Sequence, residues 1–546
     1  MKYKISAVVL KISLLLPLSV SVLASDQFAG VVTSATPEAT AAGVSILEQG
    51  GNAIDAAIAV SLALGISEPA GSGVAGQTVM LIHPGNGEAP FVINGTSWSP
   101  REIPDSVTRD QLRSGYTAST VPSTPRVLDF AHREFGSGSV AWSALVQPAI
   151  ELAENGFEVG PFRERAFRYY GAILREQKTA AEIYVRADGK DYQIGDRVIQ
   201  RKSAAMLRRL AEHGADDFYT GEIAASIARD MAANGGWITM NDLQNFPDPQ
   251  IVEPLIGHFR GYEVATLPPP FGGWVALQIM NILQASHEQG LPDDQDGFDL
   301  AMLDALYLAH RSRQLTPESD FYDYADDMAG KVSMQQARDL LAAWQREIGG
   351  ETTHFSVVDA SGMAVAVTQS IDSYFGAGVA NPDFGFLYNN YMQGFRLDDE
   401  NSPFSLREFE MPYSSMAGTV LSRDGQVELV LGSPGSARII SAVAQVVARW
   451  AEGKADIVEA VAEPRVHAVA GRAVYIERTE LSVPMLQGLA TRKFTLRRPQ
   501  FGVAEGFYDP YFGGVHAIAR EGETWRGAAD PRRDGAVGIA FKRETE

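Results

Sequence analysis

Two adjacent hydroxyl residues lie where the sequence changes from helical to strand-like patterning. Thr352 and Thr353 follow Glu351 and precede an alternating apolar segment, His354 to Asp359. In an unbroken chain, a threonine here is an ordinary first residue of a strand. Cleavage before Thr352 would free an α-amino group that can take the proton of the threonine hydroxyl and make it a nucleophile. Which of these roles Thr352 has decides the chemistry of the protein.

Two stretches downstream of Thr352 carry groups suited to amide chemistry. Ser414 and Ser415 are adjacent hydroxyls that follow Pro412-Tyr413 and precede a predicted strand. Residues 432–436 (Gly-Ser-Pro-Gly-Ser) connect a predicted strand to a predicted helix. Backbone N–H groups at a helix N-terminus can stabilise a developing negative charge. Taken alone, each stretch is better explained as an ordinary strand entry or turn.

The patterns for metal and nucleotide sites are weak. Gly71, Gly73 and Gly76 have the spacing of a dinucleotide loop, but they follow a predicted helix and precede a strand, which is the reverse of the required order. The chain has no cysteine, and its nine histidines lack paired spacing, so a zinc site is not expected. The acidic run 293–297 lacks the spacing of a calcium loop. We therefore expect neither a metal nor a cofactor.

The elements that must position the candidate residues alternate between helices and strands. Thr36-Pro37 predicts the start of one helix, and Asn52 predicts the start of another over Ala53 to Leu64, ended by Gly65. Residues 124–345 read as mostly helical. The expected strands and the final helix cover residues 78–83, 91–93, 354–359, 363–368, 419–421, 427–431 and 437–452. Without repeats or low-complexity linkers, one interwoven α/β unit is expected.

Composition limits the partners and suggests a destination. The 546 residues include 46 basic and 67 acidic side chains, a net charge of −21, which argues against nucleic acid and anionic membranes as partners. Lys2 and Lys4 precede an apolar run that ends at Val22-Leu23-Ala24. This pattern predicts a signal peptide over residues 1–24 and export to the periplasm or medium. The alternative, a membrane anchor, is disfavoured because Lys11 interrupts the run.

The order of motifs along nearly the whole chain resembles the γ-glutamyltranspeptidase family of N-terminal-nucleophile hydrolases. The motifs that carry the resemblance are residues 50–57 (GGNAIDAA), 121–124 (VPST), 267–273 (LPPPFGG), 352–359 (TTHFSVVD), 413–416 (YSSM), 432–435 (GSPG) and 529–532 (ADPR).

The resemblance implies a four-layer αββα sandwich made as one precursor. The precursor would cleave itself between Glu351 and Thr352 into a large subunit, residues 25–351, and a small catalytic subunit, residues 352–546, which pair as a heterodimer. Thr352 would be the nucleophile and, through its α-amino group, its own base. Ser370 would hydrogen-bond the nucleophile, and Gly435 and Ser436 would form the oxyanion hole.

Further positions match substrate-binding residues of the family but differ in type. Ser414 and Ser415 are retained, whereas Asp372 replaces an asparagine or glutamate. Thr96 falls where an arginine usually holds the substrate carboxylate, and Gly394 falls where an aspartate holds the amino group. Arg101 is near the first of these positions but out of register. In addition, residues 395–412 form a segment too short and too different to be the usual active-site lid.

Three functional hypotheses follow from this pattern. The leading one is a self-processing hydrolase or transferase of γ-glutamyl amides such as glutathione, with water or an amine as acceptor. Loss of a buried bidentate contact to a carboxylate costs about 2–5 kcal/mol, which is enough to change the preferred acyl group. The second hypothesis is therefore an acylase for a different carboxyl-bearing amide. The third, of a different class, is a non-catalytic relative that never matures.

Overall fold

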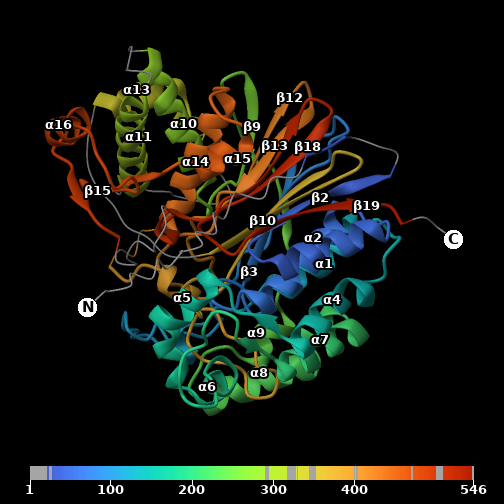
Figure 1. Cartoon of the computed structure of the whole chain (residues 1–546). Helices are drawn as coiled ribbons and strands as arrows, with labels where there is room; N and C mark the ends of the chain where they lie inside the picture. Colours follow the sequence, from blue (N-terminus) through green and yellow to red (C-terminus); the bar gives the residue numbers. More distant parts are fainter. Residues whose placement is uncertain are drawn as a thin grey trace, which may run out of the picture.

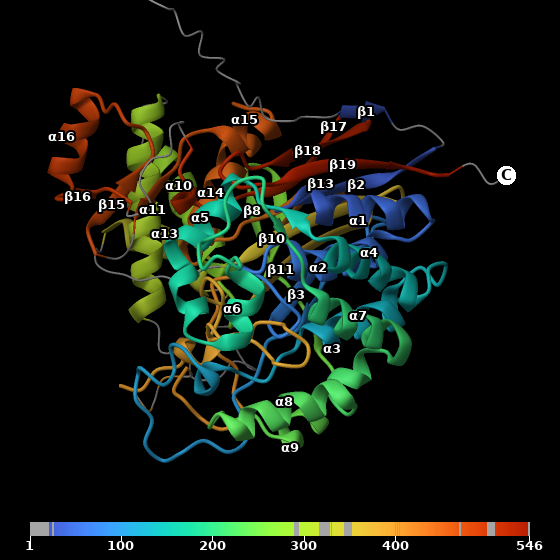
Figure 2. The same cartoon turned by 60° about the horizontal axis from the view of Figure 1, so that its bottom comes forward.

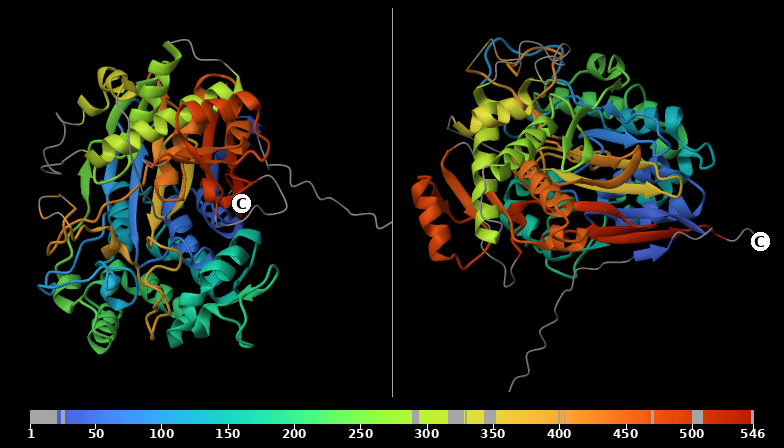
Figure 3. Two further views of the ribbon diagram at one scale, coloured as in Figure 1. Left: turned by 90° about the vertical axis from the view of Figure 1, so that its left-hand side faces the viewer. Right: turned by 90° about the horizontal axis from the view of Figure 1, so that it is seen from above.

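The computed structural model of the protein describes residues 21–23, 27–288, 294–315, 328, 330–342, 352–398, 400, 402, 404–468, 471–499 and 508–543. Two seven-stranded sheets pack face to face, and helices cover both outer faces (Figure 1). The views in Figure 3 show the strands between the two helical layers. This arrangement confirms the predicted four-layer αββα sandwich.

The first sheet has the strand order β1-β18-β17-β13-β12-β9-β8. Its strands, in chain order, are β1 (Ser21–Leu23), β8 (Leu255–Phe259), β9 (Tyr262–Thr266), β12 (Thr419–Arg423), β13 (Gln426–Gly432), β17 (His516–Glu521) and β18 (Thr524–Ala529). The second sheet has the order β19-β2-β10-β11-β3-β4-β7. Its strands are β2 (Phe28–Ser34), β3 (Gln77–His83), β4 (Phe91–Asn94), β7 (Gln250–Val252), β10 (Thr353–Asp359), β11 (Ala364–Ser370) and β19 (Ala536–Phe541).

Different helices cover the two sheets. The helices over the first sheet are α10 (Gly273–Glu288), α11 (Gln295–Leu315), α13 (Met334–Ala342), α14 (Ala437–Ala451), α15 (Ile457–Ala462) and α16 (Val483–Thr491). The helices over the second sheet are α1 (Pro37–Glu48), α2 (Ala53–Ser67), α3 (Thr124–Phe135), α4 (Trp142–Asn155), α7 (Arg201–His213), α8 (Glu222–Ala233) and α9 (Met240–Gln244). Figure 2 shows α1, α2, α4 and α7 gathered beside this sheet.

Short elements complete the described chain. These are η1 (Tyr116–Ala118), β5 (Phe157–Glu158), α5 (Pro161–Tyr170), η2 (Gly171–Arg175), α6 (Lys178–Tyr184), β6 (Arg197–Val198), η3 (Ala215–Phe218), η4 (Tyr391–Gly394), β14 (Val466–Ala468), β15 (Ala473–Ile476), β16 (Thr495–Arg497) and η5 (Pro510–Phe512). No helix in the described part of the chain combines the length and apolar character needed to cross a membrane.

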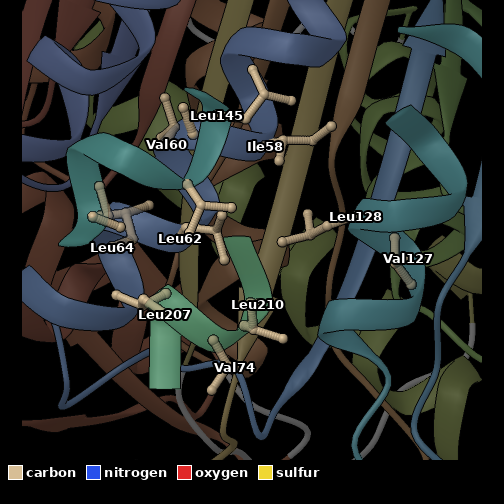
Figure 4. Close-up of a cluster of buried hydrophobic side chains, with 14 of the residues drawn as sticks. Ile58, Val60, Leu62, Leu64, Val74, Val127, Leu128, Leu145, Leu207 and Leu210 are labelled. Atoms are coloured by element: carbon tan, nitrogen blue, oxygen red, sulfur yellow. The ribbon is translucent and has the colours of Figure 1, made fainter. Parts of the chain in front are cut away.

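Apolar side chains fill three layers between these elements. Val31, Val358 and Val430 belong to a cluster between the two sheets. On the outer face of the second sheet, α2 is buried along nearly its whole length, and Figure 4 shows its Ile58 and Leu62 packed among leucines of α3, α4 and α7. Because both faces of β10 are covered, all seven of its residues are buried. The start of this strand is therefore held rigidly.

Most of the predicted elements are present, with two differences. The helix capped by Asn52 continues past Gly65 to Ser67. The residues on either side of Gly65 remain packed in the core, and the chain turns only at Glu68-Pro69. The region expected to be mostly helical also contains the five strands β5 to β9. Arg260 and Gly261 both have positive φ in the tight turn that joins β8 to β9, and this residue pair was the overlooked signal for a hairpin.

Each sheet contains strands from both sides of residue 352. In the second sheet, β10 and β11 lie between β2 and β3, which precede them by about three hundred residues. In the first sheet, β12 pairs with β9. The predicted large and small subunits would therefore share both sheets, and the chain forms one interwoven α/β unit.

Candidate active site

Thr352 lies where the chain enters the middle of the second sheet. The residue is buried, with 4% of its surface exposed. The antiparallel register pairs Thr353 with Gln369, which places Thr352 beside Ser370 at the end of β11. Glu351, on the other side of the predicted cleavage, lies outside the described residues. Strand pairing thus brings together the predicted nucleophile and its predicted hydrogen-bonding neighbour.

A buried carboxylate lies beside this strand entry. Glu68 follows the last turn of α2, and only 1% of its surface is exposed. Its Oε2 accepts a hydrogen bond from the hydroxyl of Thr353. A buried carboxylate needs such partners, because removal from water disfavours its charge. The sequence placed Glu68 only in a loop, since no local pattern indicates that its side chain reaches β10.

The glycine-rich loop after Glu68 packs against the strand ends. The N–H of Ile371 donates to the carbonyl of Gly71 at 3.3 Å. A Cβ at Gly71 would lie 3.6 Å from the carbonyl oxygen of Thr352, an ordinary contact, whereas a Cβ at Gly76 would lie 2.2 Å from the carbonyl oxygen of Ser370. Only glycine fits at the second position. The loop therefore fixes the backbone of both Thr352 and Ser370.

Asp372 lies two residues beyond Ser370 in a left-handed conformation, with φ of +76°. Its N–H donates to the hydroxyl oxygen of Ser370 at 2.7 Å, and its carboxylate accepts a hydrogen bond from Nε2 of Gln393 at 2.6 Å. Burial raises the pKa of the Asp372 carboxyl from 3.8 to about 7, although the bond from Gln393 opposes the shift. The charge of this group therefore changes near neutral pH.

Tyr391 connects the two hydroxyl stretches that the sequence singled out. Its ring is buried, and its hydroxyl lies near the polar side chains of Ser370, Gln77 and Ser414. Burial raises the pKa of the phenol above its usual value of 10, so the hydroxyl stays protonated. The sequence analysis missed Tyr391, because its role depends on three elements that only the fold brings together.

The Ser414-Ser415 segment is held from two sides. The N–H of Ser414 donates to the carbonyl of Pro270 at 3.2 Å. From α11, the guanidinium of Arg313 donates to the carbonyl of Ser414 at 3.0 Å and to the hydroxyl of Ser415 at 3.4 Å, and it lies over the ring of Tyr413. A cation is thus placed beside both predicted substrate-binding serines. Arg313 was not identified from the sequence.

Residues 433–436 form the predicted oxyanion loop between β13 and α14. Gly435 and Ser436 both have positive φ, +121° and +63°, and the fifteen-residue helix α14 begins immediately afterwards. The N-terminus of a helix carries unpaired backbone N–H groups and a partial positive charge, the environment expected to stabilise an oxyanion. Ser433 is fully buried and accepts a hydrogen bond from the N–H of Gly514, so its hydroxyl anchors the loop.

Thr96 lies apart from this cluster. Its hydroxyl donates to Oδ1 of Asn94 at 2.7 Å, and it lines a small cavity of about 110 Å³ with Arg126. The N–H and the hydroxyl of its neighbour Ser97 both donate to the side-chain oxygen of Gln77, which lies near Tyr391. Arg101 donates to the carbonyl of Asn245 and lies over a phenylalanine ring, so it contacts a different part of the molecule.

Gly394 lies on η4, close to the segment that precedes Ser414. A Cβ at Gly394 would lie 3.3 Å from the carbonyl oxygen of Tyr413. The carbonyls of the residues on either side, Gln393 and Phe395, accept hydrogen bonds from the guanidinium of Arg109 at 3.1 and 2.8 Å. Where the family pattern has a carboxylate for an amino group, this chain therefore has no side chain and a nearby cation.

A cavity of about 1010 Å³ adjoins the cluster. Ser373 and Gln393 line it next to Asp372, and Arg438 lines it next to Gly435. The cavity therefore reaches the candidate site both beside Asp372 and beside the oxyanion loop. No group of three or more metal-ligating side chains suited to hold an ion occurs in the described part of the chain.

Comparisons with known proteins agree with the fold and with the order of the motifs. A family model described as Gamma-glutamyltranspeptidase matches residues 39–540. The glutathione hydrolase proenzyme of Escherichia coli K12 is 32% identical over 491 residues, which cover 80% of each chain. The acylase ACY 1 proenzyme of Pseudomonas sp. SE83 is 32% identical over 537 residues, 93% of this chain and 92% of its own.

Comparison with a solved structure supports the same fold. The cephalosporin acylase from Bacillus halodurans superposes with a TM-score of 0.82 over 96% of this chain and 97% of its own, at 25% identity. The sandwich, with a hydroxyl residue at the head of a central strand, defines an N-terminal-nucleophile hydrolase. The chain belongs to the γ-glutamyltranspeptidase family, whose members include enzymes named as hydrolases and as acylases.

Proposed function

We propose that this protein is a self-processing amidohydrolase that cleaves its chain between Glu351 and Thr352 and then acts on γ-glutamyl amides such as glutathione. The observation that carries the proposal is the position of Thr352, which is buried beside Ser370 and close to the hydroxyl groups of Tyr391 and Ser414. The family assignment and the names of the relatives as proenzymes also support it.

In the proposed reaction the Thr352 hydroxyl attacks the amide carbonyl carbon while its proton passes to the α-amino group. The carbonyl oxygen becomes an oxyanion, which the N–H groups of Gly435 and Ser436 stabilise. The C–N bond then breaks, and the leaving amine takes the proton from the α-ammonium. Water or another amine attacks the resulting ester, and the threonine hydroxyl is restored.

Different residues would bind the two charged groups of the acyl part of the substrate. Arg313, together with Ser414 and Ser415, would hold the terminal carboxylate of the acyl group. Asp372 in its charged form would hold the α-ammonium of a γ-glutamyl substrate.

A second candidate is an acylase for a carboxyl-bearing acyl group that has no ammonium, such as glutaryl. The specific observation in its favour is Gly394, which offers no carboxylate and is flanked by carbonyls bound to Arg109. The name of the acylase relatives is consistent with it. In this case the carboxyl of Asp372 would be protonated and neutral when the substrate is bound.

Two measurements test the proposal. Denaturing electrophoresis of the wild-type protein should show two fragments, Thr352→Ala should stay at full length, and Thr352→Ser should mature slowly. Kinetics with a γ-glutamyl anilide and a glutaryl anilide then assign the acyl group. A clear preference for glutaryl would reject the first candidate in favour of the second. A wild-type chain that stays whole and hydrolyses neither anilide would support the non-catalytic alternative.

We also propose that the protein is exported and that residues 1–24 are removed as a signal peptide, which would also remove the edge strand β1 (Ser21–Leu23) from the first sheet. The support is the charged start, the apolar run and the Val22-Leu23-Ala24 cleavage pattern. N-terminal sequencing of the larger fragment from the native host should begin at Ser25. A fragment that retains the first residues would contradict this proposal.

A further inference from the structure

The large cavity beside the candidate site is built from parts of the chain that are far apart in sequence. Its walls come from α5 and η2, from the segments that follow β11 and contain Gln393, from the first turn of α14, and from β15, β16 and η5. Both predicted subunits contribute to it. At about 1010 Å³ it lies at the upper end of the range for small-molecule sites.

Four guanidinium groups line this cavity: Arg113, Arg438, Arg497 and Arg498. No acidic side chain lines it in the described part of the chain. Arg113 also contacts Asp110 at 3.3 Å, but that pair is largely exposed and therefore weak. The lining of the cavity is therefore positively charged, although the whole protein has a net charge of −21. Arginine binds carboxylates in bidentate geometry, so the cavity suits a group with more than one negative charge.

Five tyrosines also line the cavity: Tyr169, Tyr170, Tyr374, Tyr475 and Tyr511. Tyr170 and Tyr374 stack in parallel with their centroids 4.0 Å apart, and Tyr475 and Tyr511 are 4.7 Å apart. Arg438 lies over Tyr511. Tyr169 is half exposed. Flat aromatic walls next to guanidinium planes favour a planar ring that can stack between them.

The position of the cavity indicates which half of the substrate it receives. Thr352 and Ser414 are buried, whereas three of the cavity arginines (Arg113, Arg497 and Arg498) are exposed. The acyl group must stay at the buried threonine through the acyl-enzyme stage, while the amine must leave toward solvent and an acceptor must enter from there. The outer cavity is therefore the natural place for the amine half.

We propose that the arginine- and tyrosine-lined cavity binds the leaving or accepting amine, and that this amine carries a planar ring with two or more carboxylates. This inference rests on the proposed amidohydrolase function but is independent of which acyl group is preferred. It assigns the cavity a ligand class that neither γ-glutamyl nor glutaryl recognition requires.

Three amides of one acyl group test the proposal: the anilide, the 3-carboxyanilide and the 3,5-dicarboxyanilide. The wild-type enzyme should favour the dicarboxyanilide over the anilide by about tenfold or more in kcat/KM, which corresponds to roughly 1.4 kcal/mol. High salt should reduce this preference, since it screens exposed charges. Equal rates for all three amides would overturn the proposal.

Substitution of exposed arginines locates the effect. The double variant R497Q/R498Q should raise KM for the dicarboxyanilide while leaving kcat/KM for the anilide unchanged. Arg201→Gln, at the exposed start of α7 and outside the cavity, is the matched control and should change neither. A double variant that loses activity equally on both amides would contradict the assignment.

Direct binding separates this inference from the proposed function. Calorimetry of the wild-type protein with free 5-aminoisophthalate should show binding that R497Q/R498Q weakens. If the protein binds 5-aminoisophthalate but hydrolyses no amide, the proposed function is rejected and the inference about the cavity is kept. If it hydrolyses amides but does not bind 5-aminoisophthalate, the inference is rejected and the proposed function is kept. A preference for a dicarboxybenzoyl acyl group instead of the dicarboxyanilide would place the anion on the acyl side and overturn the assignment.

Discussion

At the scale of single residues, the candidate site depends on groups whose protonation is set by burial. Asp372 combines a positive φ, a hydrogen bond to Ser370 and a carboxyl with a pKa of about 7. The hydroxyl of Tyr391 remains a neutral donor, because burial raises its pKa. Local sequence identifies Asp372 through its family position but cannot show its protonation state, which depends on what packs around it.

Substitution of Asp372 tests the role of its charge. With a γ-glutamyl anilide, kcat/KM should rise as pH increases through about 7, because the charged carboxylate binds the substrate ammonium. Asp372→Asn should abolish this part of the profile. The α-amino group that the proposed cleavage would create on Thr352 is expected to titrate in this range as well. A glutaryl anilide, which has no ammonium, is therefore the control and should show only that second ionisation with either protein. Identical profiles for both substrates would contradict this role of Asp372.

The same group makes a prediction for stability. Its pKa is raised in the folded state, so the folded protein binds this proton more tightly than the unfolded chain does. The buried charge therefore destabilises the fold increasingly as pH rises from about 4 to above 7. Asp372→Asn should raise the thermal midpoint at pH 8 and change it little at pH 4. A midpoint increase of equal size at both pH values would refute this explanation.

Removal of the Tyr391 hydroxyl should separate activity from folding. Tyr391→Phe keeps the ring in the core but removes the hydroxyl that lies near Ser370, Gln77 and Ser414. We expect kcat to fall about ten- to a hundredfold and the free energy of unfolding to fall by about 1–3 kcal/mol. Tyr192→Phe, whose hydroxyl donates to the carbonyl of Ile183 away from the site, is the control. An unchanged kcat would rule out a positioning role for Tyr391.

At the scale of elements, the site is made by the ends of β10 and β11 and by the loop that packs against them. The loop contains a matched pair of glycines that tests this arrangement. Gly76→Ala would place a Cβ 2.2 Å from the carbonyl of Ser370, whereas Gly71→Ala would make an ordinary contact at 3.6 Å. Electrophoresis should show self-cleavage impaired by Gly76→Ala and retained by Gly71→Ala. Equal self-cleavage by the two variants would indicate that the loop does not position Ser370.

The sequence predicted elements well where the signals were local and poorly where they were not. Helix caps at Thr36 and Asn52 and the strands around residue 356 were correctly placed. The extension of α2 past Gly65 was missed, because tertiary packing outweighs the helix penalty of one glycine. The contacts of Glu68, Arg109 and Arg313 were also missed, since each reaches a segment far away in sequence. Motif order, in contrast, assigned candidate roles to Thr352, Ser370 and the 432–436 loop, and the fold places the first two side by side.

At the scale of the whole molecule, the two predicted subunits cannot separate without unfolding. β10 and β11 fill the middle of the second sheet, and β12 and β13 join β9 to β17 in the first. Cleavage before Thr352 would cut the backbone while leaving these strand pairings in place. The cleaved protein should therefore elute in size-exclusion chromatography as one species of full mass, and its fragments should part only in denaturant. Dissociation in native buffer would contradict this prediction.

The central claim is that Thr352 is both the new N-terminus and the nucleophile. Mass spectrometry of protein quenched during turnover of a slow amide tests both points together. The account predicts a small fragment that begins at Thr352 and carries the mass of the acyl group on that residue. An adduct on Ser414 or another residue, or amide turnover by an uncleaved chain, would contradict it.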